Sequence, residues 1–212
     1  MTSRQTGVTS IRELGEVFDV QPWLDYRAVL SADEYRESYL LSLLNDESFA
    51  HAPEGSPLPW VPLHAWRALG QMRSLALIDP VLRLAEDDAY IHAYSDFEKL
   101  SAEIGEPAID PLIAILTDQT RSVCSRTLSA VGLGAIGRSA AGATRTRIIE
   151  ALMDQIRNHA TDGWVNGAAT GALIAMQEQA VGPEVLRMYK QGQIQGSVRK
   201  DDLIAFFGPL PE

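Results

Sequence analysis

The stretch "GLGAIG", residues 132–137, carries the pattern Gly-x-Gly-x-x-Gly and raises the question of which fold surrounds it. The pattern binds a dinucleotide only where a buried strand enters it and a helix leaves it. The preceding stretch "RSVCSRTLSAV", residues 121–131, spaces its apolar residues as a helix does. The acid expected about 20 residues further on would be Asp154, which falls in another helical pattern. We therefore interpret these glycines as parts of a helical fold and not as a cofactor loop.

Glycine recurs after an apolar residue at a regular interval. The stretches "HAWRALG", "KLSAEIG" and "GLGAIG" end at Gly70, Gly105 and Gly137, at intervals of 35 and 32 residues. Glycine supplies the left-handed residue that closes a helix, because it has no Cβ to clash there. We predict that each of the three closes a helix, and we place Gly134 in the turn region outside the aligned position.

A second signal marks the start of another helix after the first two glycines. Asp79-Pro80 opens "DPVLRLAEDD" and Asp110-Pro111 opens "DPLIAILTD". Aspartate suits the N-cap, and proline suits the first helical position because its missing N–H has no partner there. The step between the prolines is 31 residues, and Pro183 follows 72 residues later, about two periods. The repeating unit is therefore a helix, a turn and a helix.

Helix pairs at such a period are typical of α-solenoids, in which stacking of neighbouring pairs supplies the core. The sequence resembles the HEAT-repeat family, and within it the short repeats also found in phycobilin lyase subunits, whose first helix ends in Ala-Leu-Gly as "RALG" does at residues 67–70. The resemblance covers residues 60–194. It implies an all-α fold, a right-handed α-solenoid of about four helix pairs. Two features depart from the family: the insertion "RSAAGATRTR" at residues 138–147, and Met176 where a closing glycine is expected.

The segments outside the repeats predict helical caps. Ser31 and Glu34 have capping-box spacing at the start of "SADEYRESYLLSLLND". The prolines of "HAPEGSPLPWVP", residues 51–62, interrupt any helix and indicate a linker. The stretch "VRKDDLIAFFGPLPE" predicts a final amphipathic helix and a tail. We therefore divide the chain into an N-terminal cap with linker, a repeat array, and a C-terminal cap, at residues 1–59, 60–194 and 195–212.

Composition is that of a globular chain. The 212 residues are 46% hydrophobic and 22% charged, with no apolar run near 18 residues and a polar start, "MTSRQTGVTS". We expect a cytoplasmic protein without a membrane span or signal peptide. The single cysteine, Cys124, can form no intrachain disulfide, and we expect it to be buried on a repeat helix.

Residues with the spacing of a catalytic or metal site are lacking in the sequence. The four histidines lie far apart, and none has the partner that a metal-ligand motif requires: His51, His64, His92 and His159. No nucleophile elbow or phosphate-binding loop is present. We assign no metal, no cofactor and no catalytic residue, although triads that assemble from distant residues stay open.

Aromatic residues cluster near the start of the array. Tyr90, Tyr94 and Phe97 fall on one helical face, and Trp60 and Trp66 flank the entrance to the first repeat. Packing in the core or a cap is the first interpretation. The alternative is an aromatic groove that holds a partner helix or a flat tetrapyrrole.

Charge is distributed unevenly along the chain. The net charge is −10, but residues 1–118 hold 8 Lys+Arg against 20 Asp+Glu, and the remainder holds 10 against 8. No acid occurs between Gln119 and Ile149, where five arginines lie: Arg121, Arg126, Arg138, Arg145 and Arg147. They are either solvated on separate helix faces or joined in one site for an anion or an acidic partner.

The pair Arg145 and Arg147 favours the second interpretation. We expect both in the first turn of the helix that follows the insertion, where the helix dipole disfavours cations. A bound phosphate or partner carboxylate would compensate for that cost. The expected partner is an acidic protein segment or the acidic half of a second copy.

Three functions are open. We favour a non-catalytic scaffold that binds a protein on the concave face of the solenoid. The alternative is a subunit or chaperone similar to phycobilin lyases, holding a tetrapyrrole and its acceptor protein. A nucleic-acid binder similar to HEAT-like glycosylases is less consistent with the chain, because a net charge of −10 has the wrong sign for phosphates.

Overall fold

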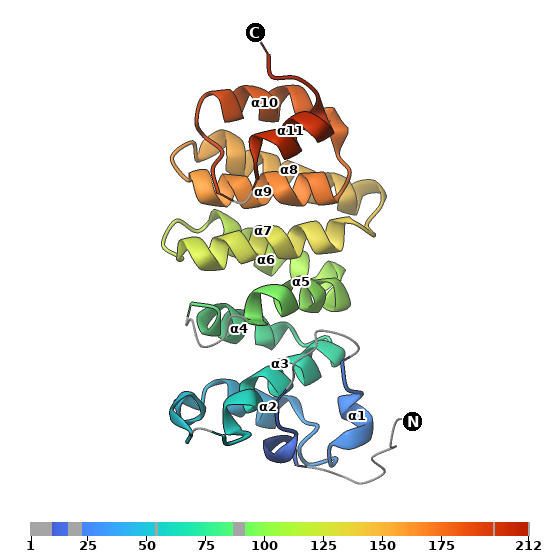
Figure 1. Ribbon diagram of the computed structural model, residues 1–212. Helices are drawn as coiled ribbons and strands as arrows, with labels where there is room; N and C mark the ends of the chain where they lie inside the picture. Colours follow the sequence, from blue (N-terminus) through green and yellow to red (C-terminus); the bar gives the residue numbers. More distant parts are fainter. Residues whose placement is uncertain (1–9, 17–22, 54, 87–91, 197, 212) are drawn as a thin grey trace, which may run out of the picture. The chain divides into compact units, whose positions relative to one another are not determined.

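The computed structural model describes residues 10–16, 23–53, 55–86, 92–196 and 198–211 (Figure 1). Within these ranges every regular element is an α- or 3-10 helix and no strand occurs, which confirms the all-α prediction. None of the helices described there is both long and apolar enough to cross a membrane.

The chain divides into two compact units, Met1–Asp96 and Phe97–Glu212, and each is described by itself. This boundary lies within helix α5 (His92–Ile104). The division into caps and a repeat array follows a different criterion, the repeat period, and stays a prediction.

The first unit is built around helix α3, which is buried over residues 61–70. Short helical elements of the same unit, η1, α1 and α2, pack against it. Pro62 is tolerated because it lies in the first turn, where its missing N–H needs no helical partner. The elements are η1 (Ile11–Glu13), α1 (Tyr26–Val29), α2 (Glu37–Leu44), η2 (Glu47–His51), η3 (Leu58–Trp60), α3 (Val61–Gln71), η4 (Leu75–Leu77), α4 (Ile78–Leu84) and the start of α5.

The second unit consists of successive helices joined by short connections. Helix α7 packs against α6, α8 and α9, and α9 packs against α8. Figure 1 shows α7 and α9 side by side. The elements after α5 are η6 (Glu106–Ala108), α6 (Ile109–Thr117), α7 (Val123–Gly137), α8 (Gly142–Asn158), α9 (Gly163–Ala175), η7 (Gln179–Val181), α10 (Gly182–Lys190) and α11 (Lys200–Phe207).

The helix ends confirm one of the three predicted glycine closures and correct two. Gly105 follows α5 with φ +76°, the left-handed conformation that was predicted. Gly70 instead lies inside α3, and the left-handed residue there is Arg73, at φ 56°. Gly137 is the last residue of α7 and has no positive φ. Hydrogen bonds back to the helix hold the strained conformation of Arg73, since its N–H donates to the Gly70 carbonyl at 2.9 Å.

The helix starts at the Asp-Pro pairs lie two residues earlier than predicted. Helix α4 begins at Ile78 and α6 at Ile109, so Asp79 and Asp110 lie in the first turn and are not N-caps. A 3-10 turn, η4 or η6, leads directly into each helix and supplies its first backbone acceptors. The aspartates still lie at the positive end of the helix dipole, which explains the sequence signal.

The N-terminal capping pattern is realised in part. The hydroxyl of Ser31 accepts the N–H of Glu34 at 3.2 Å, but residues 32–36 form turns and α2 starts only at Glu37. The Glu34 carboxylate accepts a hydrogen bond from the Ser10 hydroxyl and does not complete the box. At the other end, α11 is the helix expected near the C-terminus.

The glycines of "GLGAIG" belong to α7, and they permit close helix packing. A Cβ on Gly134 would lie 2.7 Å from Ala172 Cβ and 3.0 Å from Ala172 Cα on α9. A Cβ on Gly137 would lie 2.5 Å from Met176 Sδ. The prediction that the pattern is no dinucleotide loop is confirmed, and the placement of Gly134 in a turn is wrong. These glycines let the backbones of α7 and α9 approach.

We expect Gly134→Ala to lower the free energy of unfolding by about 2 kcal/mol, because the new methyl group meets Ala172 Cβ and Cα, two atoms that cannot rotate away. Gly105→Ala is the matched control. Its Cβ meets nothing nearer than 3.9 Å, so the cost is the left-handed strain alone, about 1 kcal/mol. Urea unfolding of the two variants measures both losses, and a Gly134→Ala protein as stable as the wild type would contradict the close packing.

Candidate functional site

The five arginines of the acid-free segment do not share a surface. Arg126 is buried, with a residue exposure of 2%. Its guanidinium donates to the Leu116 carbonyl at 2.9 Å, to Gln155 Oε1 at 3.1 Å and to Asp162 Oδ2 at 2.8 Å. The hydrogen bond from Arg126 lowers the pKa of Asp162. An anion from solvent cannot reach this guanidinium, so the assignment of Arg126 to an anion site is wrong.

Arg145 holds together the ends of two helices. One nitrogen donates to the carbonyl of Gly137 at 2.9 Å, and another to the carbonyl of Met176 and to Glu178 Oε2 at 3.3 Å. These carbonyls end α7 and follow α9, at the negative ends of the helix dipoles. The unfavourable position of Arg145 near the start of α8 is therefore compensated within the chain, without a bound anion.

The other arginines meet acids from neighbouring helices. Arg138 pairs with Glu98 of α5, and Arg147 pairs with Asp110 of α6. Arg121, at the turn before α7, is half-buried. A site built from all five is thus not supported, because four of them already have carboxylate partners in the same chain, namely Asp162, Glu98, Glu178 and Asp110.

We expect Arg145→Ala to destabilise the protein by about 1–2 kcal/mol, because it leaves two half-buried helix-end carbonyls without their donor. Arg147→Ala is the control. Its pair is exposed, with side-chain exposures of 53% and 71%, so the loss stays below about 0.5 kcal/mol. Thermal and urea unfolding check both values, and equal stability of the two variants would refute the role of Arg145.

The predicted aromatic groove does not include Trp66. Trp66 is fully buried in α3 and its Nε1 donates to Asp96 Oδ2 at 2.8 Å. Trp60 is half-buried at the start of α3. Tyr90 and the side chain of Tyr94 lie outside the described residues. For Trp66 the core interpretation is confirmed, and its assignment to a groove is wrong.

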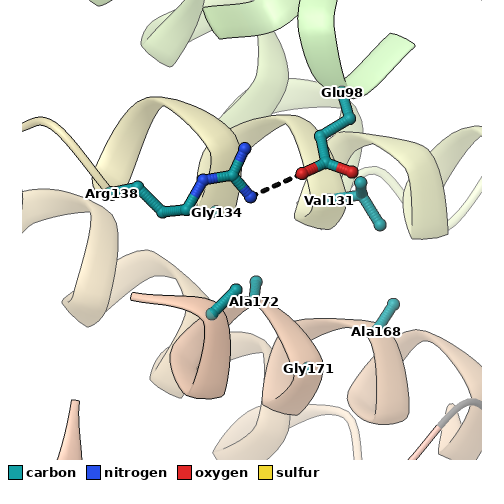
Figure 2. Close-up of a pocket in the computed structure, with 8 residues that line it drawn as sticks. Glu98, Val131, Gly134, Arg138, Ala168, Gly171 and Ala172 are labelled. Atoms are coloured by element: carbon teal, nitrogen blue, oxygen red, sulfur yellow. Dashed lines mark hydrogen bonds and ion pairs between the residues drawn. The ribbon is translucent and has the colours of Figure 1, made fainter. Parts of the chain in front are cut away.

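A hollow does exist in the second unit, on the face formed by α5, α7 and α9 (Figure 2). Small residues form its floor: Gly134 of α7 and Ala168, Gly171, Ala172 and Ala175 of α9. Val131 and the ion pair between Glu98 and Arg138 line the other side, and Figure 2 shows that pair spanning the space between α5 and α7. We call this face the α5–α7–α9 groove.

Helix α9 also carries an exposed tryptophan, one turn before Ala168 and outside the lining of the hollow, that the sequence analysis missed. Trp164 is 63% exposed, and Trp164, Ala168, Gly171 and Ala175 recur at i, i+4, i+7 and i+11 on one helical face. Large apolar side chains at this exposure are typical of contact surfaces when they adjoin an apolar hollow. The sequence signal for this surface was a large residue followed by small ones at i+4 and i+7 of the same helix.

Chemical groups for catalysis or metal binding do not gather in this groove. Among the described residues no group of three or more His, Cys, Asp or Glu side chains has the arrangement of a metal site. Cys124, expected to be buried, is half-buried on α7. The carboxylate nearest the groove, Glu98, is held by Arg138.

Comparison with known proteins adds no relative: no family model matches the sequence, and no curated protein or solved structure matches it significantly.

Proposed function

We propose that this chain is a HEAT-like α-solenoid that works as a non-catalytic protein-binding scaffold, with the α5–α7–α9 groove as its contact face. The observation that carries the proposal is the exposed groove with a floor of glycine and alanine beside an indole that is 63% exposed. Such a floor admits the backbone of a partner segment at short range, and the tryptophan offers a large apolar anchor.

The rim of the groove sets the chemistry of the partner. The side chains of Glu98 and Arg138 are each 43% exposed. Both can therefore form further hydrogen bonds on their solvent side while they bind each other. The groove fits a partner segment that has an apolar stripe and a polar or charged end. The stripe would contact the alanine floor, and the polar end would contact the pair of Glu98 and Arg138. The acidic partner expected from the arginine count loses its basis, because those arginines are paired within the chain.

The groove surface supports binding rather than a reaction. Its described lining consists of Gly, Ala and Val, with Glu98 and Arg138 as the polar groups. Neither a nucleophile nor a histidine lies among these side chains, and the single carboxylate is fixed by an ion pair. The proposal therefore assigns no catalytic step.

The test is affinity capture from the source cell with paired alanine-to-arginine variants. Ala175→Arg places a long cation across the groove floor, and Ala143→Arg places the same residue at an exposed position on α8, outside the groove. We expect the wild type and Ala143→Arg to retain the same set of proteins by mass spectrometry. Ala175→Arg and Trp164→Ala lose that set by at least about tenfold, because a blocked anchor site costs 1.4 kcal/mol or more.

Two outcomes would overturn the proposal. Equal capture by Ala175→Arg and Ala143→Arg would mean that the bound proteins contact another surface. Visible absorbance after coexpression with enzymes of bilin synthesis, lost in Ala175→Arg and retained in Ala143→Arg, would replace the scaffold by a tetrapyrrole-holding subunit.

A further inference from the structure

A buried histidine fastens the N-terminal segment of the first unit to α3. His64 is 1% exposed, and its Nδ1 lies 2.8 Å from the hydroxyl of Tyr26 while its Nε2 lies 2.9 Å from the carbonyl of Gly15. A carbonyl only accepts, so Nε2 carries the hydrogen and donates it to Gly15. Nδ1 therefore accepts the Tyr26 hydroxyl proton. Both bonds are satisfied only when the imidazole is neutral.

The charges around His64 are balanced without it. Arg67 donates to both carboxylate oxygens of Asp96, from Nε at 2.6 Å and from a terminal nitrogen at 3.0 Å. Both side chains are buried, so their charges cancel within the interior. A proton on His64 adds a positive charge beside Arg67 and takes the acceptor away from Tyr26. Burial raises the pKa of Tyr26, which keeps its hydroxyl a donor.

Among the described residues, which include Glu16 beside Gly15 and Asp25 at the start of α1, no carboxylate contributes to the pKa of His64. From η1, Arg12 is exposed and lies over the ring of Phe49, and Glu13 is exposed. From α2, Glu37 accepts a hydrogen bond from Ser74 at the other end of α3. Burial, and then the positive charge of Arg67, lower the pKa of His64, while its bond to Gly15 acts in the opposite direction.

We propose that His64 is an acid-operated latch: protonation of Nδ1 breaks the bond from Tyr26 and releases residues 10–16 and α1 from α3. The released segment carries Ile11, which is fully buried in the closed state, so opening exposes an apolar side chain and the surface of α3 beneath it. The latch belongs to the first unit and does not depend on the groove of the second.

The direction of the pH dependence follows from linkage. The closed state holds the pKa of His64 below its value in the open chain, about 6.5, so the open state binds the proton more readily. The closed state is fully favoured above that value and loses stability as the pH falls below it. Opening is therefore expected as the pH falls below the pKa of His64 in the open chain.

The test follows amide hydrogen exchange of residues 10–16 in the full chain between pH 7.5 and pH 4.5, after correction for the intrinsic exchange rate. We expect protection to be lost with one acid midpoint in the wild type. Tyr26→Phe removes the donor that stabilises the neutral ring, so its midpoint shifts upward by about half a pH unit or more. His64→Gln keeps an acceptor and a donor but cannot be protonated, so its loss of protection shifts downward by at least about one unit.

His51→Gln is the control, because His51 is exposed in the same unit, and its midpoint should equal that of the wild type. An acid midpoint in His64→Gln equal to that of the wild type would overturn the proposal. If His64→Gln fails to fold, ¹⁵N chemical shifts of the wild-type imidazoles decide instead. A neutral Nε2–H tautomer that titrates below His51 supports the latch, and titration together with His51 refutes it.

Discussion

The close approach of α7 and α9 is the constraint on which the second unit depends. Gly134 brings the backbone of α7 so near Ala172 that a methyl group would not fit between them. Gly137 makes room for the side chain of Met176 in the same way. Both helices carry small residues where they meet, and the face beside the contact consists of glycine and alanine as well. These small side chains leave the hollow that we propose as a contact surface.

The same approach explains the arginines. Since α7 and α9 end close together, one guanidinium, that of Arg145, reaches the carbonyls of both helix ends. Four arginines of the acid-free segment at residues 119–149 are thus paired with carboxylates only in the folded chain. These carboxylates come from α5, α6 and the segments before and after α9. The charge pattern that resembled a ligand site is a set of ion pairs and hydrogen bonds between neighbouring helices of the same chain.

Sequence reasoning predicted the all-helical class, because helix periodicity is a local property of the sequence. It misplaced features that depend on partners distant in sequence. The glycine pattern could not reveal that Gly134 faces Ala172, and the count of arginines could not show that Arg126 is buried against Asp162. Trp66 is a residue of the type that lines aromatic grooves, but its indole lies in the core and donates a hydrogen bond to Asp96, 30 positions away. The exposed Trp164 carried a readable pattern that was overlooked.

A double-mutant cycle between α7 and α9 tests the central claim most directly. Ala172→Gly removes the methyl group that a Cβ at position 134 would meet at 2.7 Å. If the two backbones approach as described, Gly134→Ala is partly rescued in the Ala172→Gly background, with a coupling free energy of unfolding of about 1 kcal/mol or more. Additive losses, with a coupling near zero, would show that the two positions do not touch and would contradict the account of the fold and of its groove.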